Sequence, residues 1–586
     1  MSDLVFRLDV RAPERRRIVV ELEVDRTALA PAADGATEFF LPTWTPGSYL
    51  IREYARHLGP VCASDAATGA AVPCVKSRKN RYRVDLPAGV QRLRLRYDVY
   101  AHELTVRTSD VTDRHAYWNH ACVLLWPVDR PDAAADVAVR VPPGWDCCGG
   151  VPVERAGDGA FSYRLADLDT AIDSPMLAGA FERLELDVLG VRHVLALDDH
   201  GPVRPVESFA ADVRHIVERA AAVFGDALPY PHYTFLCLFA QSGYGGLEHR
   251  DSTTLLSPRS VLAGGKGYRD FLGLLAHELF HAWNVKRMRP EELWRYDYEN
   301  ETHTSMLWLA EGWTAYYDDL LCRRAGAFSV AQYLEQIERN LGGLWSGAGR
   351  FRQSLAESSF DAWIRYYRPD ENTRNQTQNY YGNGALAAMA LDLTIRDATD
   401  GARSLDDVLR RLWQTTWERG RGYRREDVAA CLSEVAGRDL GPMLRELTEG
   451  PLDPDFDRLL QLVGIRIEAD DADRPWFGLA LENGRTQVAS VTDDSPAHAS
   501  GIAPGDELLA LDGLRVRSDC WTDVVNATAQ IDRPLRVLTA SRGLIVERTL
   551  VPSKPPRSKV RLVLADEIDA RTASLRRGWL GDDTAS

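Results

Sequence analysis

The 586-residue sequence has no long run of apolar residues, and its first segment, MSDLVFRLDVRAPERRR, has no apolar core of the kind that signal peptides carry. We therefore expect neither a membrane-spanning helix nor a signal peptide. Basic patches interleaved with aromatic residues are also missing, and the formal net charge is −15. This acidic balance disfavours nucleic acid and membrane as partners.

Cysteine pairs with metal or disulfide spacing are missing as well. The nine cysteines are scattered, and their number is odd. Free thiols in a reducing compartment explain them most simply, so we expect a cytoplasmic protein. Apolar residues at 45% and charged residues at 26% exclude a disordered chain and indicate a soluble globular protein of several domains.

The spacing of apolar residues divides the chain. Residues 1–185 show a period of two, as in RIVVELEV and RLRLRYDVY, which predicts an N-terminal domain of antiparallel strands. From about residue 205 the period is helical, as in SFAADVRHIVERAAAVFG and GALAAMALDLTIRDA. We assign 186–466 to this mostly helical second domain. The acidic stretch EADDADRP, Glu468 to Pro475, then interrupts the pattern as a linker.

The stretch LLAHELFHAWNVKRMRP places two histidines four residues apart, with a glutamate directly after the first. On a helix His277 and His281 share one face and can bind one metal ion. Glu278 can act as general base toward the attacking water. A second copy of AHEL, at Ala101–Leu104, lies inside a predicted strand with a period of two and has no second histidine. We expect that copy to be inert.

A catalytic zinc ion usually has three protein ligands. In the helical segment LWLAEGWTAYYDD, Glu311 stands among apolar residues, where a solvated surface charge is poorly explained. Glu311 is therefore the candidate third ligand. Asp318, seven residues further on, could orient a ligand imidazole. It could equally be an exposed helix acid beside Asp319.

The motifs LPTWTPGSYLIREYARHL, HELFHAWNVKRMRP, LWLAEGWTAYYDDL and YYGNGALAAMALDLTIR occur in this order along the chain. Together they resemble the glycyl aminopeptidases, metallopeptidase family sixty-one. The resemblance implies a multidomain α+β protein in which an N-terminal β domain precedes a thermolysin-like zinc peptidase domain. It also implies His277, His281 and Glu311 as ligands of one zinc ion, with Glu278 as base.

The stretch GYGGLEHRDST falls where related zinc aminopeptidases have a Gly-x-Met-Glu-Asn segment, whose glutamate holds the free α-amino group of the substrate. By this resemblance Glu248 and Gly246 are substrate-binding residues. Leu247 and His249 replace the methionine and the asparagine, and an ordinary loop acid remains the alternative for Glu248.

In the related pattern Tyr-x-Lys-Gly, the tyrosine hydroxyl stabilises the tetrahedral oxyanion. The chain has Tyr381-Gly382-Asn383-Gly384, which keeps the tyrosine but replaces the lysine by Asn383. We assign the oxyanion role to Tyr381 because of its spacing to Gly384. The adjacent Tyr380 is the rival.

Other residues in these motifs have simpler explanations. The cluster around Trp44 and Gly47 is typical of a packed turn between strands. Lys286, Arg287 and their neighbours after the zinc helix are expected to be solvated or to cap it. Asn119, in YWNHACVLLWP, could line the active-site cleft from the first domain.

The segment DSPAHASGIAPGDELLALDG resembles the core of a PDZ domain, which we place at 467–560. Such a domain can hold a peptide C-terminus on a glycine-bearing loop, here Phe477, Gly478 and Leu479. A PDZ fold that only packs on the enzyme is the alternative. Residues 561–586 are expected to form a C-terminal tail, although Trp579 and Leu580 could anchor it.

The sequence thus predicts a zinc aminopeptidase that removes a small N-terminal residue, Gly or Ala by the resemblance, from peptides with a free N-terminus. A related zinc endopeptidase that captures peptide C-termini on the PDZ domain is one alternative. A non-catalytic peptide-binding scaffold is the other. The sequence does not indicate the oligomeric state, the physiological substrate or the PDZ ligand.

Overall fold

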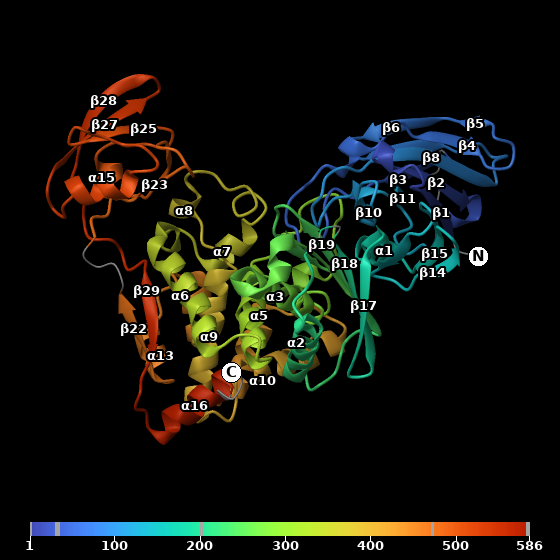
Figure 1. The fold of residues 1–586 in the computed structure, drawn as a ribbon. Helices are drawn as coiled ribbons and strands as arrows, with labels where there is room; N and C mark the ends of the chain where they lie inside the picture. Colours follow the sequence, from blue (N-terminus) through green and yellow to red (C-terminus); the bar gives the residue numbers. More distant parts are fainter. Residues whose placement is uncertain (1–2, 30–34, 200, 202, 470–473, 582–586) are drawn as a thin grey trace. The chain divides into compact units, whose positions relative to one another are not determined.

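The computed structural model describes residues 3–29, 35–199, 201, 203–469 and 474–581. Two compact units are formed. The first contains the described residues up to Thr302 together with Gly420–Gly422, and the second contains the rest (Figure 1). The expected multidomain α+β architecture, with a β-rich N-terminal part and a helical catalytic part, is confirmed. None of the described helices has the length and apolar character needed to cross a membrane.

The first unit begins with an eight-stranded sheet. Its order is β14 (Glu154–Gly157), β15 (Ala160–Leu165), β12 (Ala135–Arg140), β1 (Leu4–Asp9), β2 (Arg17–Asp25), β8 (Arg92–Tyr100), β4 (Cys62–Asp65) and β5 (Ala71–Val72). In β2 (Arg17–Asp25) and β8 (Arg92–Tyr100) alternate side chains are buried, as the period of two predicts. The pairing is antiparallel except that β1 (Leu4–Asp9) lies parallel to β12 (Ala135–Arg140). A four-stranded sheet has the order β11 (Trp126–Pro127), β3 (Ala36–Phe40), β7 (Arg81–Asp85) and β6 (Cys74–Arg78). Buried residues of the two sheets form one continuous core.

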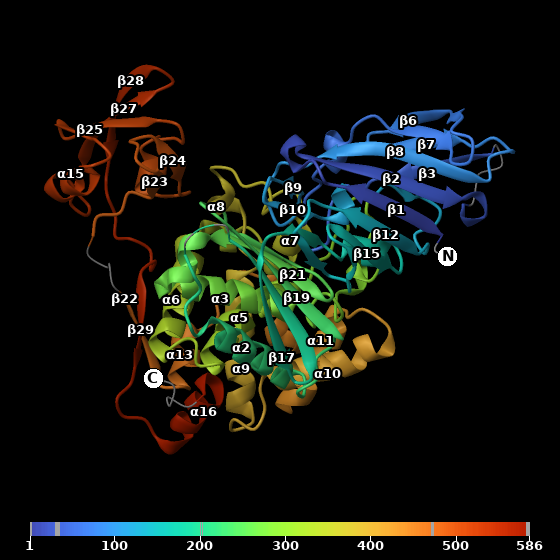
Figure 2. The ribbon, with the colours of Figure 1, turned by 45° about the vertical axis from the view of Figure 1, so that its right-hand side comes forward.

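A five-stranded sheet in the order β17-β18-β19-β21-β20 follows in the same unit. Strands β18 (Val191–Asp198), β19 (His232–Ala240) and β21 (Ser252–Pro258) are parallel, and the edge strand β20 (Gly245–Glu248) runs antiparallel to β21. Helices α2 (Phe209–Val223) and α3 (Gly265–Phe280) contact each other and cover one face (Figure 2). The expected domain border at 185–186 falls inside β17 (Glu182–Val188), which pairs along its whole length with β18.

The second unit is helical from α4 (Leu307–Ala310) to α13 (Phe456–Gln461). Helix α5 (Gly312–Arg324) packs against α9 (Gly382–Ala398), and α6 (Val330–Ser346) packs against both. Every residue of α9 from Asn383 to Arg396 is buried, so α9 is the central helix of this unit.

The C-terminal part contains short strands and helices. Strand β23 (Leu479–Leu481) pairs with β24 (Val488–Val491). A four-stranded sheet has the order β26 (Leu514–Arg515), β25 (Glu507–Leu511), β27 (Leu535–Ser541) and β28 (Leu544–Leu550). Helix α15 (Trp521–Thr528) packs on β25 (Glu507–Leu511). This C-terminal part has a small apolar core of its own, which includes Phe477, Val488 and Leu508.

The region expected to be a C-terminal tail is instead structured in its described residues. Strand β29 (Val560–Leu564) pairs with β22 (Ile465–Ala469). Residues 467–469 and 560, which the sequence assigned to the PDZ domain, therefore belong to this ladder and lie outside the small apolar core. Helix α16 (Ala570–Leu580) follows, and its fully buried Trp579 donates to the Tyr316 hydroxyl of α5 at 2.8 Å. The anchoring alternative for Trp579 and Leu580 is the one observed. Of the expected linker, residues 470–473 lie outside the described residues.

Candidate functional site

The two motif histidines lie at the C-terminal end of α3. His277 is in the last turn, and His281 follows Phe280 as the C-cap residue, still in a helical conformation. Both are buried, and their ring centroids are 4.7 Å apart. His281 donates its Nδ1–H to the backbone carbonyl of Asn284 at 2.7 Å. This bond fixes the tautomer and leaves Nε2 available to a metal ion.

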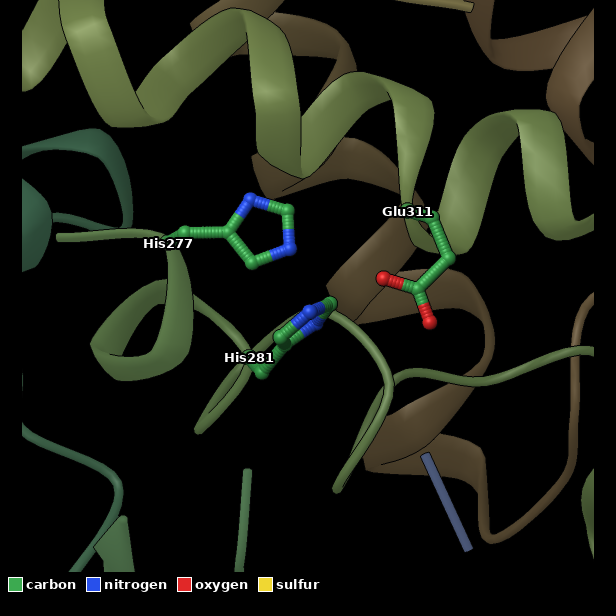
Figure 3. Close-up of side chains that lie close together, drawn as sticks. All are labelled: His277, His281 and Glu311. Carbon is green, nitrogen blue, oxygen red and sulfur yellow. The ribbon is translucent and has the colours of Figure 1, made fainter. Parts of the chain in front are cut away.

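Glu311 stands at the junction of α4 and α5 and is only 2% exposed. Potential ligand atoms of His277, His281 and Glu311 all lie within 4.8 Å of one another (Figure 3). Two imidazole nitrogens and one carboxylate oxygen are a donor set typical of catalytic zinc, with one position left for water or substrate. The three residues predicted as ligands therefore fit a zinc ion.

Glu278 lies on the same helix turn as His277 and is buried. Its carboxylate packs directly under Gly246 of β20, because a Cβ added at Gly246 would meet Glu278 Oε1 at 2.2 Å. Only glycine leaves room for the carboxylate at this point. The edge strand and the predicted general base are thus in van der Waals contact.

Glu248, at the end of β20, is 3% exposed and was predicted to bind the substrate amine. Its carboxylate, that of Glu278 and a ring nitrogen of His281 lie within 4.8 Å of one another. Two buried carboxylates this close favour cations near them. A zinc ion and the ammonium group of a peptide are cations of the required kind.

The glycine of the early motif LPTWTPGSYL is part of this arrangement. Gly47 has φ of 93°, and a Cβ there would meet the Glu248 carboxylate at 2.2–2.5 Å. Its neighbour Trp44 is fully buried and donates its indole N–H to the Asp297 carbonyl at 2.7 Å. The motif is a packed turn, as predicted, but the turn also shapes the wall against Glu248. Sequence reasoning missed this second role.

The basic residues after the zinc helix were expected to be solvated or to cap it. Solvation is wrong, whereas a capping contact is present, because Arg287 donates from Nη1 to the Ala282 carbonyl just after the helix at 2.9 Å. Lys286 is 2% exposed and pairs with Asp173 at 2.6 Å. Arg287 is 3% exposed and pairs with Asp251 at 2.8 Å. Burial alone would lower the pKa of Lys286, but the charge of Asp173 outweighs it and the pKa is raised. These residues stay charged because acids distant in sequence meet them.

Tyr381, the predicted oxyanion donor, is the N-cap residue of α9 and is half-buried. Burial, with the charge of Glu311 as the next cause, raises its pKa well above the usual range, so the hydroxyl remains a donor. The rival Tyr380 is fully buried and stacks on Tyr381 with ring centroids 4.8 Å apart. Partial exposure and the proximity of Glu311 favour Tyr381.

Asn383, which replaces the lysine of the related pattern, is buried and donates to Gln378 Oε1 at 3.1 Å. In the same motif Gly384 meets Gly312 where α9 crosses α5. A Cβ at Gly312 would lie 2.6 Å from Gly384 Cα, and one at Gly384 would lie 2.8 Å from Gly312 Cα. This glycine-on-glycine crossing holds the helix that begins at Tyr381 against the helix that begins after Glu311.

Asp318 lies half-buried on α5 and accepts a hydrogen bond from the Asp319 backbone N–H. Its predicted role in orienting an imidazole stays a prediction, since the orienting bond seen at His281 comes from Asn284. The sequence carried no signal for that carbonyl, because any residue type supplies one.

Helix-borne histidines, a carboxylate third donor and a buried base define a metal-dependent hydrolase. Among known families, the model described as M61 glycyl aminopeptidase matches residues 270–387, and that of the Peptidase M61 N-terminal domain matches 6–180. The two ranges together span half of the chain. The chain belongs to this family and is a zinc metallopeptidase of the aminopeptidase type. No curated protein matches it.

The fold is shared with a solved structure over nearly the whole chain. The aminopeptidase N family protein from Idiomarina loihiensis has a TM-score of 0.90 and 26% identity, over 98% of this chain and 100% of that one. The M1 zinc metallopeptidase from Deinococcus radiodurans has a TM-score of 0.47 and 17% identity, over 77% of this chain and 94% of that one. A mutant of the latter bound to a Tyr-Ser-Ala substrate has a TM-score of 0.46 and 18% identity over the same shares.

Proposed function

We propose that the chain removes single N-terminal residues, small ones such as Gly or Ala, from peptides with a free amine. One observation carries the proposal: the buried Glu248 carboxylate lies within 4.8 Å of both Glu278 and His281. A carboxylate and an ammonium about 4 Å apart attract by roughly 4 kcal/mol at an effective dielectric near 20, before desolvation is counted. An amine held there places the first carbonyl beside the base, so cleavage falls after one residue.

Each residue then has a distinct task. A zinc ion, when bound by His277, His281 and Glu311, polarises the first carbonyl and acidifies water. Glu278 takes the proton of the attacking water and delivers it to the leaving amine. Tyr381 donates a hydrogen bond to the oxyanion, and Glu248 fixes the N-terminus. The preference for Gly or Ala is supported by membership in the glycyl aminopeptidase family.

A panel of amino-acid anilides tests the proposal. We expect hydrolysis of Gly- and Ala-anilide, loss of hydrolysis with a zinc chelator and recovery when zinc is restored. N-acetyl-Ala-anilide should be hydrolysed at least about 100-fold more slowly, because the acetyl group removes the charge that Glu248 binds. Equal rates on the blocked and free substrates would favour the endopeptidase. A zinc-containing protein that cleaves no peptide would indicate a scaffold.

We also propose that residues 474–553 form a PDZ-type module that binds a peptide C-terminus. Gly478, with φ of 76°, packs against Ser495, where a Cβ would meet the Ser495 Cβ at 2.1 Å. Phe477 on this loop is in edge contact with Trp521 of α15 at 5.8 Å between centroids. A strand, a helix and a glycine-bearing loop are the parts that PDZ recognition uses. Titration with a fluorescent C-terminal peptide and its amidated form checks this role.

A further inference from the structure

Arg107 brings a positive charge from the N-terminal β region to the edge strand of the catalytic sheet. Its Nη2 donates to the Gly246 carbonyl at 3.5 Å, and its Nη1 lies 3.8 Å from the position of a Cβ on Gly245. Gly246 is the residue in contact with Glu278, and β20 is the outermost strand of its sheet. The guanidinium therefore stands beside the reacting centre.

Arg107 has no acidic partner in the part of the chain that the structure describes. Among the described residues no carboxylate lies within 4.0 Å of its guanidinium, and its buried Nε has no hydrogen-bond partner there. By contrast, Arg56 from the same region pairs with Glu103 at 2.9 Å. A half-buried guanidinium with spare donors is suited to an anionic ligand, which it can bind through two parallel hydrogen bonds.

The loop that carries Arg107 is held rigidly. The fully buried Asn119 donates from Nδ2 to the carbonyls on either side, Val106 O at 3.2 Å and Thr108 O at 3.0 Å. The Tyr117 hydroxyl donates to Val106 O at 2.8 Å and lies 3.1 Å from Thr254 Oγ1 on β21. These bonds tie the loop to the strand that pairs with β20.

Apolar packing supports the same connection. Val106 belongs to a buried cluster that also contains Leu247 of β20 and Leu256 of β21. The position of Arg107 relative to Gly246 is thus set by buried hydrogen bonds and by packing, and not by its own side chain alone. Asn119, for which the sequence suggested a place lining the cleft, acts here as a positioning residue.

The distance along the strand indicates what Arg107 binds. A peptide that pairs antiparallel with β20 and has its amine at Glu248 runs toward Gly246 and Gly245. Two residues of an extended strand span about 7 Å, which brings the end of the second residue level with the guanidinium. We propose that Arg107 binds the C-terminal carboxylate of a dipeptide, so that the enzyme prefers dipeptides and releases two amino acids.

This inference rests on the aminopeptidase activity proposed above, and it is tested with Ala-Ala and Ala-Ala-amide. The amide keeps the N-terminus and the scissile bond but lacks the anion. We expect kcat/KM of the wild type to be about 10- to 100-fold higher for Ala-Ala, the range of a charge-assisted hydrogen bond. In Arg107→Ala this ratio should fall to near one, and Arg107→Lys should keep part of it.

Arg114→Ala is the matched control, because Arg114 is an exposed arginine seven residues away in the chain. Its ratio should equal that of the wild type. Melting curves of each variant report folding, and Arg107→Lys preserves the charge if Arg107→Ala is unstable. A wild-type ratio within twofold of one, or an unchanged ratio in Arg107→Ala, would overturn the inference.

Failure of the inference is distinguishable from failure of the proposed function. If wild type cleaves Ala-anilide and both peptides at similar rates, the aminopeptidase assignment stands and the role of Arg107 falls. If it cleaves no substrate with a free amine, the proposed function itself fails. For Asn119→Ala we expect a higher KM for Ala-Ala and a smaller change for the amide. Equal losses of kcat on both would remove the positioning role.

Discussion

The sequence AHEL occurs twice, and its two copies have opposite surroundings. At 276–279 it lies inside α3, where His277 and Glu278 are buried beside Glu248 and Gly246. At 101–104 it follows the end of β8, where His102 has an exposed side chain. In the second place Glu103 forms an ion pair with Arg56 at the surface.

The two copies differ in helix geometry and burial, and not in the tetrapeptide itself. A helix presents His277 and His281 together, whereas the extended copy has no second histidine to bring near His102. The extended copy is nevertheless close in sequence to Arg107. The loop that follows it carries the residue that we propose selects the substrate.

Replacing the glutamate of each copy should produce the largest difference in kcat between the two copies. Glu278→Gln should lower kcat on Ala-anilide by about 1000-fold or more, because a general base contributes up to about 10⁴-fold. Zinc content and melting temperature should stay close to those of wild type. Glu103→Gln should change kcat by less than twofold, since a surface ion pair is worth at most about 1 kcal/mol. Undiminished activity in Glu278→Gln would refute the mechanism.

For the N-terminal region, which contains the extended copy, we instead expect the free energy of unfolding to depend on pH. Burial alone would lower the pKa of His115, but hydrogen bonds to Asp110 at 3.0 Å and Asp198 at 2.6 Å raise it to about 9. A raised pKa stabilises the fold fully below about pH 6.5, and this contribution is lost as the pH rises through 9. We expect the free energy of unfolding to fall by about 3 kcal/mol between pH 6.5 and 10.

Urea unfolding at a series of pH values measures this loss. His115→Gln should be less stable than wild type at pH 6.5 and should lack most of the decline above it. His102→Ala, which removes an exposed partner of the same Asp110, should retain the decline. A wild-type stability that is flat from pH 6.5 to 10 would contradict the assignment of a charged His115.

A smaller effect is expected where the helical copy meets β20. Gly246→Ala would place a methyl group against the Glu278 carboxylate without the strain of a positive φ. Displacement of the base by a fraction of an ångström should lower kcat about 10- to 100-fold. Gly89→Ala is the control, because a Cβ at Gly89 meets no atom within 4 Å. Equal activity of the two variants on Ala-anilide would show that the contact does not position Glu278.

Much of the fold was predictable because it follows from local periodicity. The alternation Val20, Leu22, Val24 gives a buried strand face, and the helical spacing around Leu275 and Leu279 gives a buried helix. The fate of residues 561–580 was not predictable in this way. Trp579 is held by Tyr316, which is 263 residues away, and no local pattern reports such a partner.

The same distinction between local pattern and distant partners applies to the residues of the site. Helical spacing was enough to propose His277 and His281 as ligands, and an acid in an apolar setting was enough to propose Glu311. The solvated role expected for Lys286 and Arg287 was wrong, because Asp173 and Asp251 reach them only in the folded chain. Likewise, Gly47 reads as a turn residue until the Glu248 carboxylate is seen against it.

The two-stranded ladder of β22 and β29 has a consequence for modularity. Ala469 and Val560 are partners in this ladder, so the segment between them leaves and returns at one point. A segment with adjacent ends can be excised, exchanged or replaced by a short hairpin while the remaining chain keeps its path. Strands β22 and β29 would then form a hairpin, and α16 would still follow β29 in the chain. The adjacent ends of this segment therefore meet the geometric requirement for exchanging one segment for another at this position.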